Sequence, residues 1–374
     1  MRSHLIRNVV LLLIVALMAS SPVHAERADP SADTQLITPR KVFIPMLFND
    51  STPTNLGVPK LLGVVPHGYW GTTTDNVQTM LKGLDSWSGK RHSIVGWFFD
   101  VREGNPDFNF KGQLDNLWVN GYTSFVNLGA GNLTSADIAQ HKYDSYIRGI
   151  ATAYASWVKK GGGRKAFIAP LQEMNGYWVS YGKDPANFKA AYTVIRQIFR
   201  DAGVPDSSVW WVFAPNGWGE DGQDFEIYYP GDDKVDVVAF SSYNFGYCPV
   251  GNAAWRSWSD YKSVFEPYVD RMKAMAPTKP IIIAQGATSA QYPSSGTYNH
   301  DLKNQWIMDT YAYIASEPNV MALLWFDINL ENDGECDYEI YNGQYRYDGY
   351  KTAVSNQAFE YISPATLSSQ GLVQ

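Results

Sequence analysis

The residues with the clearest chemical potential lie at 166–178, where the apolar run Ala-Phe-Ile-Ala-Pro-Leu is followed by Gln, Glu, Met, Asn, Gly, Tyr and Trp. An apolar run of this length predicts a buried parallel strand. Glu173 then lies at or just past the carboxyl end of that strand, where barrel and open-sheet enzymes place their chemistry. The nearby Tyr177 and Trp178 favour a partly desolvated, protonated carboxyl, which suits a general acid. The alternative is a surface glutamate that caps the next helix.

Strand-like and helix-like segments alternate along the rest of the chain. Strands are expected at 61–65, 94–99, 123–128, 167–171, 209–214, 235–241, 281–284 and 321–326. Helices are expected at 75–84, 113–119, 143–159, 185–202, 262–275, 302–316 and 352–362. This alternation predicts an α/β protein, a (β/α)8 TIM barrel, with one domain over residues 41–374. A doubly wound sheet is the alternative, but no glycine-rich phosphate loop follows the first strand.

Aromatic, amide and acidic side chains gather where these strands are expected to end. The ones that stand at or near a strand end are His67, Asp100, Asn175, Trp178, Asn216, Trp218, Tyr243, Gln285, Trp325 and Asp327, with Glu335 and Asp337 farther out. Sugars present apolar ring faces together with many hydroxyls, so this combination predicts a carbohydrate site. For any single tryptophan, the alternative to stacking on a sugar is packing in the hydrophobic core. Six histidines without a ligand-spaced pair predict no metal, and no cofactor is expected.

Composition narrows the class of partner. Aromatics make up 14% of the residues, and the formal net charge is −7 without a basic patch, so nucleic acid is not an expected partner. The N-terminus combines Arg2 and Arg7 with an apolar run at 9–18 and a small-residue cleavage site at 23–25. We therefore expect a signal peptide at 1–25, a flexible leader at 26–40, a secreted monomer, and no membrane association after cleavage.

The chain has two cysteines, Cys248 and Cys336. In a secreted protein a pair suggests one disulfide, and two free thiols are the alternative. A bond would tie the loop after the eighth strand to the loop after the sixth, and would hold Glu335 or Asp337 near the rim. The alternative for this segment is a solvated acidic loop.

The motif at 172–178, Gln-Glu-Met-Asn-Gly-Tyr-Trp, resembles the acid/base motif of glycoside hydrolase family 26, typified by β-mannanases. That motif usually runs His-Glu-Met-Asn-Gly, with a Trp close behind. The segments 210–218, 237–243 and 279–284 resemble the same family in the same order. The resemblance implies a retaining β-glycanase in a (β/α)8 barrel. Two glutamates would then work from strands four and seven, with carboxyls about 5–5.5 Å apart.

The resemblance also implies roles for individual residues. Glu173 matches the proton donor, whereas the nucleophile position holds Gln285 and the preceding His is replaced by Gln172. Tyr243 matches a tyrosine that holds the nucleophile, and Trp325 matches the aromatic floor of the central sugar subsite. The remaining candidates for contact with the sugar are Trp178, Trp218, Asn175 and His67.

Gln285 leaves three hypotheses open, because a carboxamide is a poor nucleophile and cannot form the usual glycosyl ester. In the first, another carboxylate takes over as the base of an inverting reaction, with a separation of about 6.5–9.5 Å from the acid. The candidates for it are Asp100, Asp327, Glu335 and Asp337. In the second, the chain is an inactive relative that binds glycans. In the third, Gln285 is an engineered substitution that traps substrate. Mannan, β-1,3/1,4-glucan and xylan all remain compatible as the polysaccharide.

Overall fold

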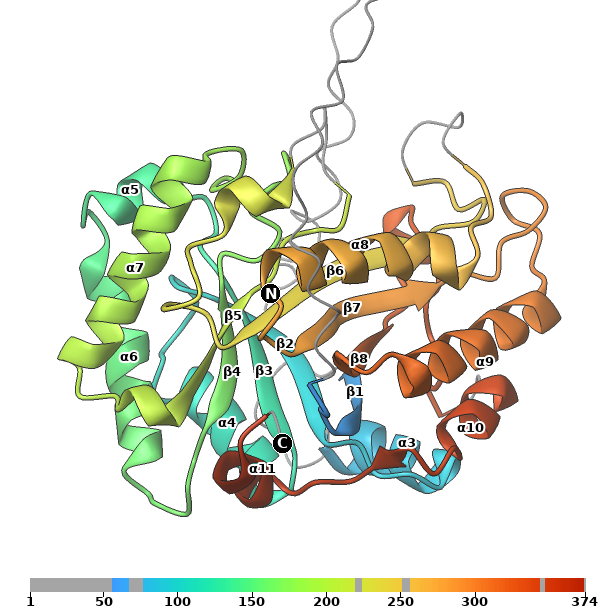
Figure 1. The fold of residues 1–374 in the computed structure, drawn as a ribbon, viewed down its shortest axis with the longest axis horizontal. Coiled ribbons are helices and arrows are strands. Elements are labelled where there is room, and N and C mark those ends of the chain that lie inside the picture. The colour runs from blue at the N-terminus through green and yellow to red at the C-terminus, as the bar shows by residue number, and fades with distance from the viewer. Residues whose placement is uncertain (1–55, 67–76, 219–223, 251–255, 344–346, 373–374) are drawn as a thin grey trace, which may run out of the picture.

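The computed structural model describes residues 56–66, 77–218, 224–250, 256–343 and 347–372 (Figure 1). The expected signal peptide at 1–25, the leader at 26–40 and His67 lie outside the described residues. Among the described residues, no helix is long and apolar enough to cross a bilayer.

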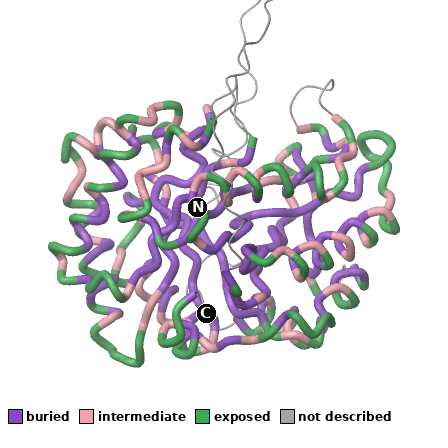
Figure 2. The backbone as a smooth tube through the Cα atoms, in the orientation of Figure 1, coloured by how far each residue is buried: buried purple, intermediate pink, exposed green. Residues whose placement is uncertain are grey.

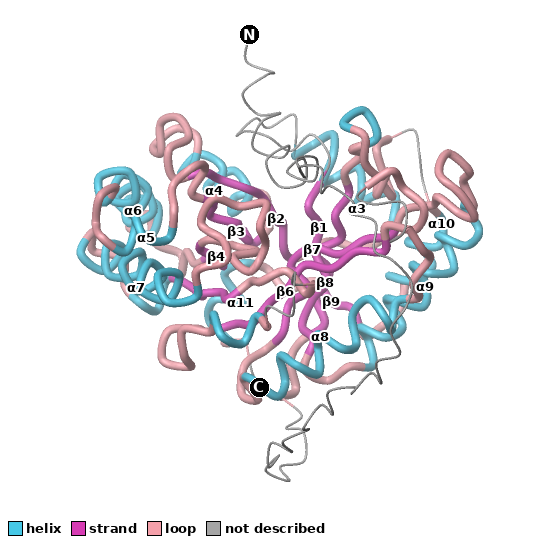
Figure 3. Tube along the Cα trace, turned by 90° about the horizontal axis from the view of Figure 1, so that it is seen from above, coloured by secondary structure: helices cyan, strands magenta, loops and turns pink. Residues whose placement is uncertain are grey.

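Eight parallel strands close into a barrel. They are β1 (Lys60–Pro66), β2 (Ile94–Asp100), β3 (Thr123–Gly129), β4 (Ala166–Pro170), β5 (Val209–Phe213), β6 (Val237–Asn244), β7 (Ile281–Thr288) and β8 (Val320–Asp327). Each strand pairs with its sequence neighbours, and β1 pairs with both β2 and β8, which closes the sheet. The (β/α)8 prediction is therefore confirmed, and the doubly wound alternative is wrong. Figure 3 looks onto the barrel, with the strands central and the helices outside.

The helices between the strands cover the outer surface of the barrel (Figures 1 and 3). They are α3 (Lys82–Ser88) after a π-helical turn at Val77–Leu81, α4 (Phe110–Val119), α5 (Ser135–Ala139), α6 (Asp144–Val158), α7 (Pro185–Asp201), α8 (Tyr261–Met275), α9 (His300–Ser316) and α10 (Asp348–Val354). The last helix, α11 (Pro364–Gln370), lies at the amino-end of the barrel, below the strands in Figure 1. Between β5 and β6 the described residues form one short 3-10 turn, at Phe225–Tyr228, and no α-helix.

The strands are apolar on both faces, as parallel strands beneath helices must be. In β2, β4, β5, β7 and β8 every residue is buried. Figure 2 shows the same arrangement, with buried backbone in the strands and exposed backbone along the outer helices and loops. Because all eight strands run in parallel, their carboxyl ends share one rim, and the turns that follow them are brought together there.

The expected closing helix at 352–362 is wrong. The chain instead forms α10, then a two-residue strand β9 (Phe359–Glu360), then α11. β9 pairs in parallel with the start of β1, Lys60 opposite Phe359, and this pairing interrupts the helical segment. Pro364 then begins α11, with the Ser363 hydroxyl accepting from the backbone N–H of Thr366. A proline at the first helical position already has a fixed, helix-compatible φ.

Candidate active site

Glu173 lies three residues beyond the end of β4, on the carboxyl-end rim of the barrel. Its backbone φ is +57°, a left-handed conformation that a glutamate rarely adopts and that costs about 1–3 kcal/mol. Two hydrogen bonds hold it there: its N–H donates to the carbonyl of Ala214 at 2.8 Å, and its carbonyl accepts from the N–H of Gly176 at 2.8 Å. The following helix, α7, is capped by Asp184, so the helix-cap alternative for Glu173 is wrong.

The Glu173 carboxyl is buried and held at both oxygens. Its Oε2 accepts from the indole N–H of Trp178 at 2.8 Å, and its Oε1 accepts from the Asn216 amide at 3.1 Å. The side chain is only 6% exposed. Burial raises the pKa of Glu173 above its ordinary value of 4.5, and the hydrogen bonds from Trp178 and Asn216 oppose part of that rise. The raised pKa keeps the group protonated to higher pH, which a general acid requires.

Two neighbours of Glu173 determine where these donors lie. Position 176 requires glycine, because a Cβ there would lie 2.4 Å from the Trp178 ring. The glycine lets the indole fold back onto the turn. Asn175 is fully buried and bonds the backbone of Asn216 twice, through its amide N–H at 2.8 Å and its amide oxygen at 2.9 Å. Asn175 therefore braces Asn216 and does not line the pocket, which corrects its expected contact with substrate.

A pocket of about 550 Å³ opens beside Glu173 at this rim. Its lining residues come mainly from the turns after β4, β5 and β6, and they are Phe98, Glu173, Tyr177, Trp178, Asn216, Trp218, Ser242, Tyr243, Phe245, Gly246, Val250, Arg256, Ser259, Ser263, Val264, Tyr268, Gln285, Phe326 and Tyr338. Trp178 and Trp218 stack with ring centroids 6.2 Å apart and planes 16° apart. Trp218 is 46% exposed, so this aromatic wall is open to a ligand. A mostly apolar hollow with a few convergent polar groups is the usual form of a ligand site.

Gln285 lines the same pocket from β7. Its Oε1 accepts a hydrogen bond from the Tyr243 hydroxyl at 2.9 Å, so the expected pairing of Tyr243 with position 285 is present. The strand pairing shifts register between Phe240 and Ser241 of β6 and between Ile283 and Gly286 of β7. Irregularities of this kind often re-aim side chains beside active sites. The amide is thus placed where the resemblance expects a carboxylate.

None of the four alternative carboxylates lines this pocket. Asp100 accepts from the N–H of Arg102 at 2.8 Å, and Asp337 accepts from the N–H of Glu339 at 2.9 Å. Asp327 accepts from the N–H groups of Ile340 and Tyr341, and burial raises its pKa to about 7. These three bind the backbone of their own loops. Within the described residues, Glu173 is the one carboxylate that lines the pocket.

Glu335 is the fourth alternative, and its environment is different. It is 6% exposed, and its Oε2 is buried without a hydrogen-bond partner. Its neighbour Cys336 is disulfide-bonded to Cys248, with a Cα–Cα distance of 5.4 Å, so the loops after β8 and β6 are joined. Burial raises the pKa of Glu335 to about 8, and the charge of Asp333 adds to the rise. The acidic segment is therefore a buried, tethered loop and not a solvated one.

The raised pKa of Glu335 predicts a pH-dependent stability. The folded protein holds this proton more tightly than the unfolded chain, so its stability falls as pH rises from about 4.5 through about 8. Glu335→Gln removes that loss. We expect its melting temperature to match the wild type at pH 4 and to exceed it at pH 9. Glu360→Gln, the same change at an exposed position of β9, is the control. Identical pH slopes for the wild type and Glu335→Gln contradict the assignment.

Trp325 does not form the floor of the pocket. It is fully buried, with its ring against Trp306 of α9, Tyr311 of α9 and Tyr350 of α10, and its indole N–H donates to the Tyr338 carbonyl at 2.9 Å. Its side chain thus points outward from the barrel, toward the helices. Successive strand residues point to opposite faces, and the next residue, Phe326, lines the pocket instead. The position expected for Trp325, on the floor of the pocket, is therefore wrong.

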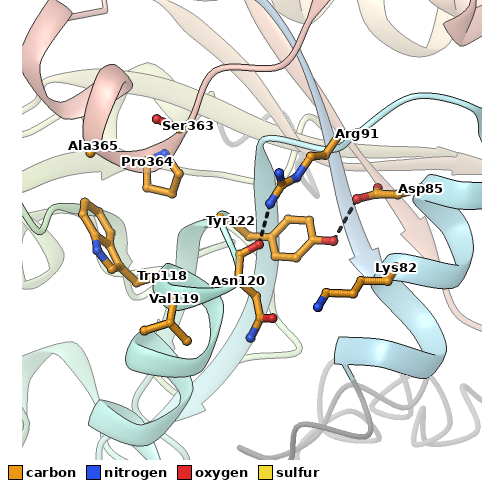
Figure 4. A pocket seen from close by; sticks show the side chains of 11 residues that line it. Lys82, Asp85, Arg91, Trp118, Val119, Asn120, Tyr122, Ser363, Pro364 and Ala365 are labelled. Carbon is orange, nitrogen blue, oxygen red and sulfur yellow. Dashed lines mark hydrogen bonds between the residues drawn. The ribbon is translucent and has the colours of Figure 1, made fainter.

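A second hollow, of about 590 Å³, lies at the opposite end of the barrel, beside the amino ends of β2 and β3 (Figure 4). In it the Tyr122 hydroxyl donates to Asp85 at 2.8 Å, and Arg91 donates to the Asn120 carbonyl at 2.6 Å. Asp85 also bonds the ring of His92 at 2.6 Å. The Asp85 carboxylate is thus occupied by hydrogen bonds within the protein. Residues at the amino end of a barrel generally contribute to stability and not to catalysis. No group of His, Cys, Asp and Glu suited to a metal ion occurs among the described residues.

Comparison with known proteins supports the resemblance noted in the sequence. Residues 137–315 match the model of glycosyl hydrolase family 26, a segment that includes the Glu173 motif, Trp218, Tyr243 and Gln285. Over 277 residues the chain is 27% identical to Endoglucanase H of Acetivibrio thermocellus. The aligned segment covers 71% of this chain and 28% of that protein. The chain therefore spans less than a third of the length of this curated relative.

Solved structures share the barrel. An endo-β-1,4-mannanase from Cellulomonas fimi superposes with a TM-score of 0.56 at 14% identity, covering 82% of this chain and 74% of its own. A family 26 β-mannanase from Bacteroides ovatus gives 0.57 at 15% identity, covering 85% and 96%. The catalytic domain of a Bacillus sp. family 26 mannanase gives 0.58 at 16% identity, covering 85% and 92%. The chain thus folds as a (β/α)8 barrel, and its sequence resembles glycosyl hydrolase family 26.

Proposed function

We propose that the chain is a glycoside hydrolase that cuts β-linked polysaccharide internally, with Glu173 as the proton donor. One observation carries the proposal: a buried carboxyl, whose pKa burial raises, faces a pocket whose wall is a pair of stacked tryptophans. Trp178 serves both parts, because its ring forms the wall and its N–H positions the acid. The mannanase and endoglucanase names of similar proteins favour a β-glycan as substrate, with mannan as the first candidate.

In this proposal Glu173 transfers its proton to the glycosidic oxygen as the bond to the anomeric carbon breaks. The sugar passes through an oxocarbenium-like state. Water then attacks the anomeric carbon and gives its proton to the Glu173 carboxylate, which restores the acid. Gln285 gives no ester in this reaction, because its amide is held by the Tyr243 hydroxyl and is a weak nucleophile. Asn216 and Trp178 stabilise the Glu173 carboxylate that remains after proton transfer.

A glycan-binding barrel without hydrolysis is the second candidate. Gln285 favours it, since Glu173 is the one carboxylate that lines the pocket within the described residues. The aromatic wall and the amides serve a bound sugar equally well in this case.

A panel of β-1,4-mannan, mixed-linkage β-glucan, xylan and an α-glucan tests both candidates. We expect release of reducing ends from at least one β-glycan and none from the α-glucan. Retention on an insoluble β-glycan without release of reducing ends favours the binding barrel. Neither binding nor cleavage of any β-glycan contradicts both candidates.

The pH dependence of cleavage tests the proton on Glu173. The Asn216 amide donates to this carboxyl, so Asn216→Asp removes a donor and adds a like charge, and both changes raise the pKa of Glu173. We expect the alkaline limb of kcat/KM to move up by roughly one pH unit. Asn332→Asp, the same change at an exposed position, should leave the limb in place. A shift of the limb to lower pH would contradict the role of Glu173 as acid.

We also propose that the protein acts outside the cell as a monomer, with polysaccharide as its partner. The charged, apolar and small-residue pattern of residues 1–25 supports export. The disulfide between Cys248 and Cys336 suits an oxidising compartment.

A further inference from the structure

The pocket beside Glu173 contains one cation. Among its described lining residues, Glu173 and Arg256 are the only ones with acidic or basic side chains other than tyrosine. Burial keeps Glu173 protonated to higher pH than usual, and an arginine stays charged at every physiological pH. When Glu173 is protonated, the described lining residues together carry a net positive charge and favour an anionic ligand.

The Arg256 guanidinium is largely without partners. Its Nη2 donates to the Pro249 carbonyl at 3.1 Å, whereas its Nε is buried without a hydrogen-bond partner. No ion pair joins Arg256 to an acid in the part of the chain that the structure describes. A partly desolvated guanidinium with unused donors is costly unless a ligand completes it.

The position of Arg256 is set by the loop after β6. Ser257 pairs with Gly246 in an antiparallel bridge, and the Asn244 side chain accepts from the N–H groups of Gly246 at 3.2 Å and Ser259 at 3.1 Å. These bonds hold the Arg256 segment against the end of β6. Glu173 comes from the turn after β4 and Arg256 from the segment after β6, and both line the pocket. A ligand that contacts both Glu173 and Arg256 therefore extends beyond the glycosidic bond at Glu173.

We propose that this pocket binds a β-linked glycan carrying carboxylate groups, a polyuronide or a glycan with uronic acid units, and that Arg256 receives one of those carboxylates. The inference rests on the proposed glycan-binding function of the pocket and names its substrate class. A guanidinium matches a carboxylate with two parallel N–H donors, which a lysine or an amide does not reproduce. The Trp178–Trp218 wall then holds the ring face of a neighbouring unit.

Two ligands that differ only at C6 test the inference. A β-1,4-linked mannuronate hexasaccharide carries a carboxylate on each unit, and the matching mannohexaose carries a hydroxymethyl group instead. Calorimetric titration is done at low salt in the Glu173→Gln protein, so that cleavage does not consume either ligand. We expect the acidic ligand to bind about tenfold or more tightly than the neutral one, as a charge-assisted hydrogen bond gives. This advantage should shrink with added salt.

Arg256→Gln in the same background should remove the preference and leave the affinity for mannohexaose within about twofold. Arg148→Gln, an equal charge change at an exposed position of α6, should leave both affinities unchanged. Equal affinity of the two ligands overturns the inference. So does an equal loss of both on Arg256→Gln, because Arg256 then binds sugar hydroxyls.

The outcomes separate this inference from the proposed hydrolysis. Cleavage of a neutral β-glycan by the wild type, without a preference for the acidic ligand, overturns the inference and leaves the hydrolase proposal standing. Tight, Arg256-dependent binding of the mannuronate ligand, without cleavage of neutral or acidic glycans, supports the inference and contradicts hydrolysis.

Discussion

Glu173→Gln should lower the rate of β-glycan cleavage by about 10²–10⁴-fold, the usual contribution of a positioned acid–base group. The amide keeps the shape of the carboxyl but has no proton acidic enough to give to the leaving oxygen. Binding should change little, because the aromatic wall of Trp178 and Trp218 is intact. Initial rates of reducing-end release and the affinity for the same glycan measure the two effects separately.

Glu103→Gln is the matched control. Glu103 follows β2 on the same rim, and burial also raises its pKa, yet it does not line the pocket. We expect it to retain the wild-type rate. Equal rates for the wild type and Glu173→Gln would show that the acid has been assigned to the wrong residue.

Gln285→Glu should raise the rate of cleavage by about 100-fold or more. A carboxylate there can attack the anomeric carbon or activate water, and a positioned base alone contributes about 10²–10⁴-fold. The change introduces a carboxylate where the Tyr243 hydroxyl already donates at 2.9 Å, so the partner for the new charge is in place. The added negative charge also raises the pKa of Glu173 further, which keeps the acid protonated. The measurement compares the cleavage rates of the wild type and Gln285→Glu on one β-glycan. A wild-type-like melting transition shows that the variant is folded.

Gln172→Glu makes the same change at another buried glutamine, which lies in the small adjoining cavity and not in the main pocket. It should give no gain. No gain from Gln285→Glu either would show that position 285 is not a lost nucleophile.

The barrel was predictable because its strands are apolar runs separated by helices, and because parallel strands deliver their ends to one rim. Within such an apolar run, the sequence does not predict whether a side chain points into the barrel or outward toward the helices. Trp325 and Phe326 are both buried, so the sequence does not indicate which one points into the barrel. The parallel pairing of Phe359 with Lys60 is likewise a long-range contact, and it overrode the helical pattern at 352–362.

At the site, the Glu173 motif located the acid, but the roles of its neighbours depend on contacts across strands. Asn175 braces Asn216 and Asn216 positions the acid, a relay between the turns after β4 and β5 that spacing along the chain does not reveal. Arg256 lies in a segment without a motif, and only its place in the pocket identifies it. The disulfide between Cys248 and Cys336 resolved a choice that two cysteines alone left open.

The most direct test of the central claim, that Glu173 donates the proton to the leaving group, compares two substrates that differ only in that group. One is a β-linked oligosaccharide with a sugar leaving group, and the other is the same glycone with a dinitrophenyl group, which departs without protonation. The measurement is kcat/KM of the wild type relative to Glu173→Gln for each substrate. We predict a ratio of about 100 or more for the oligosaccharide and of about one for the dinitrophenyl glycoside. An equal ratio for the two substrates would contradict the claim.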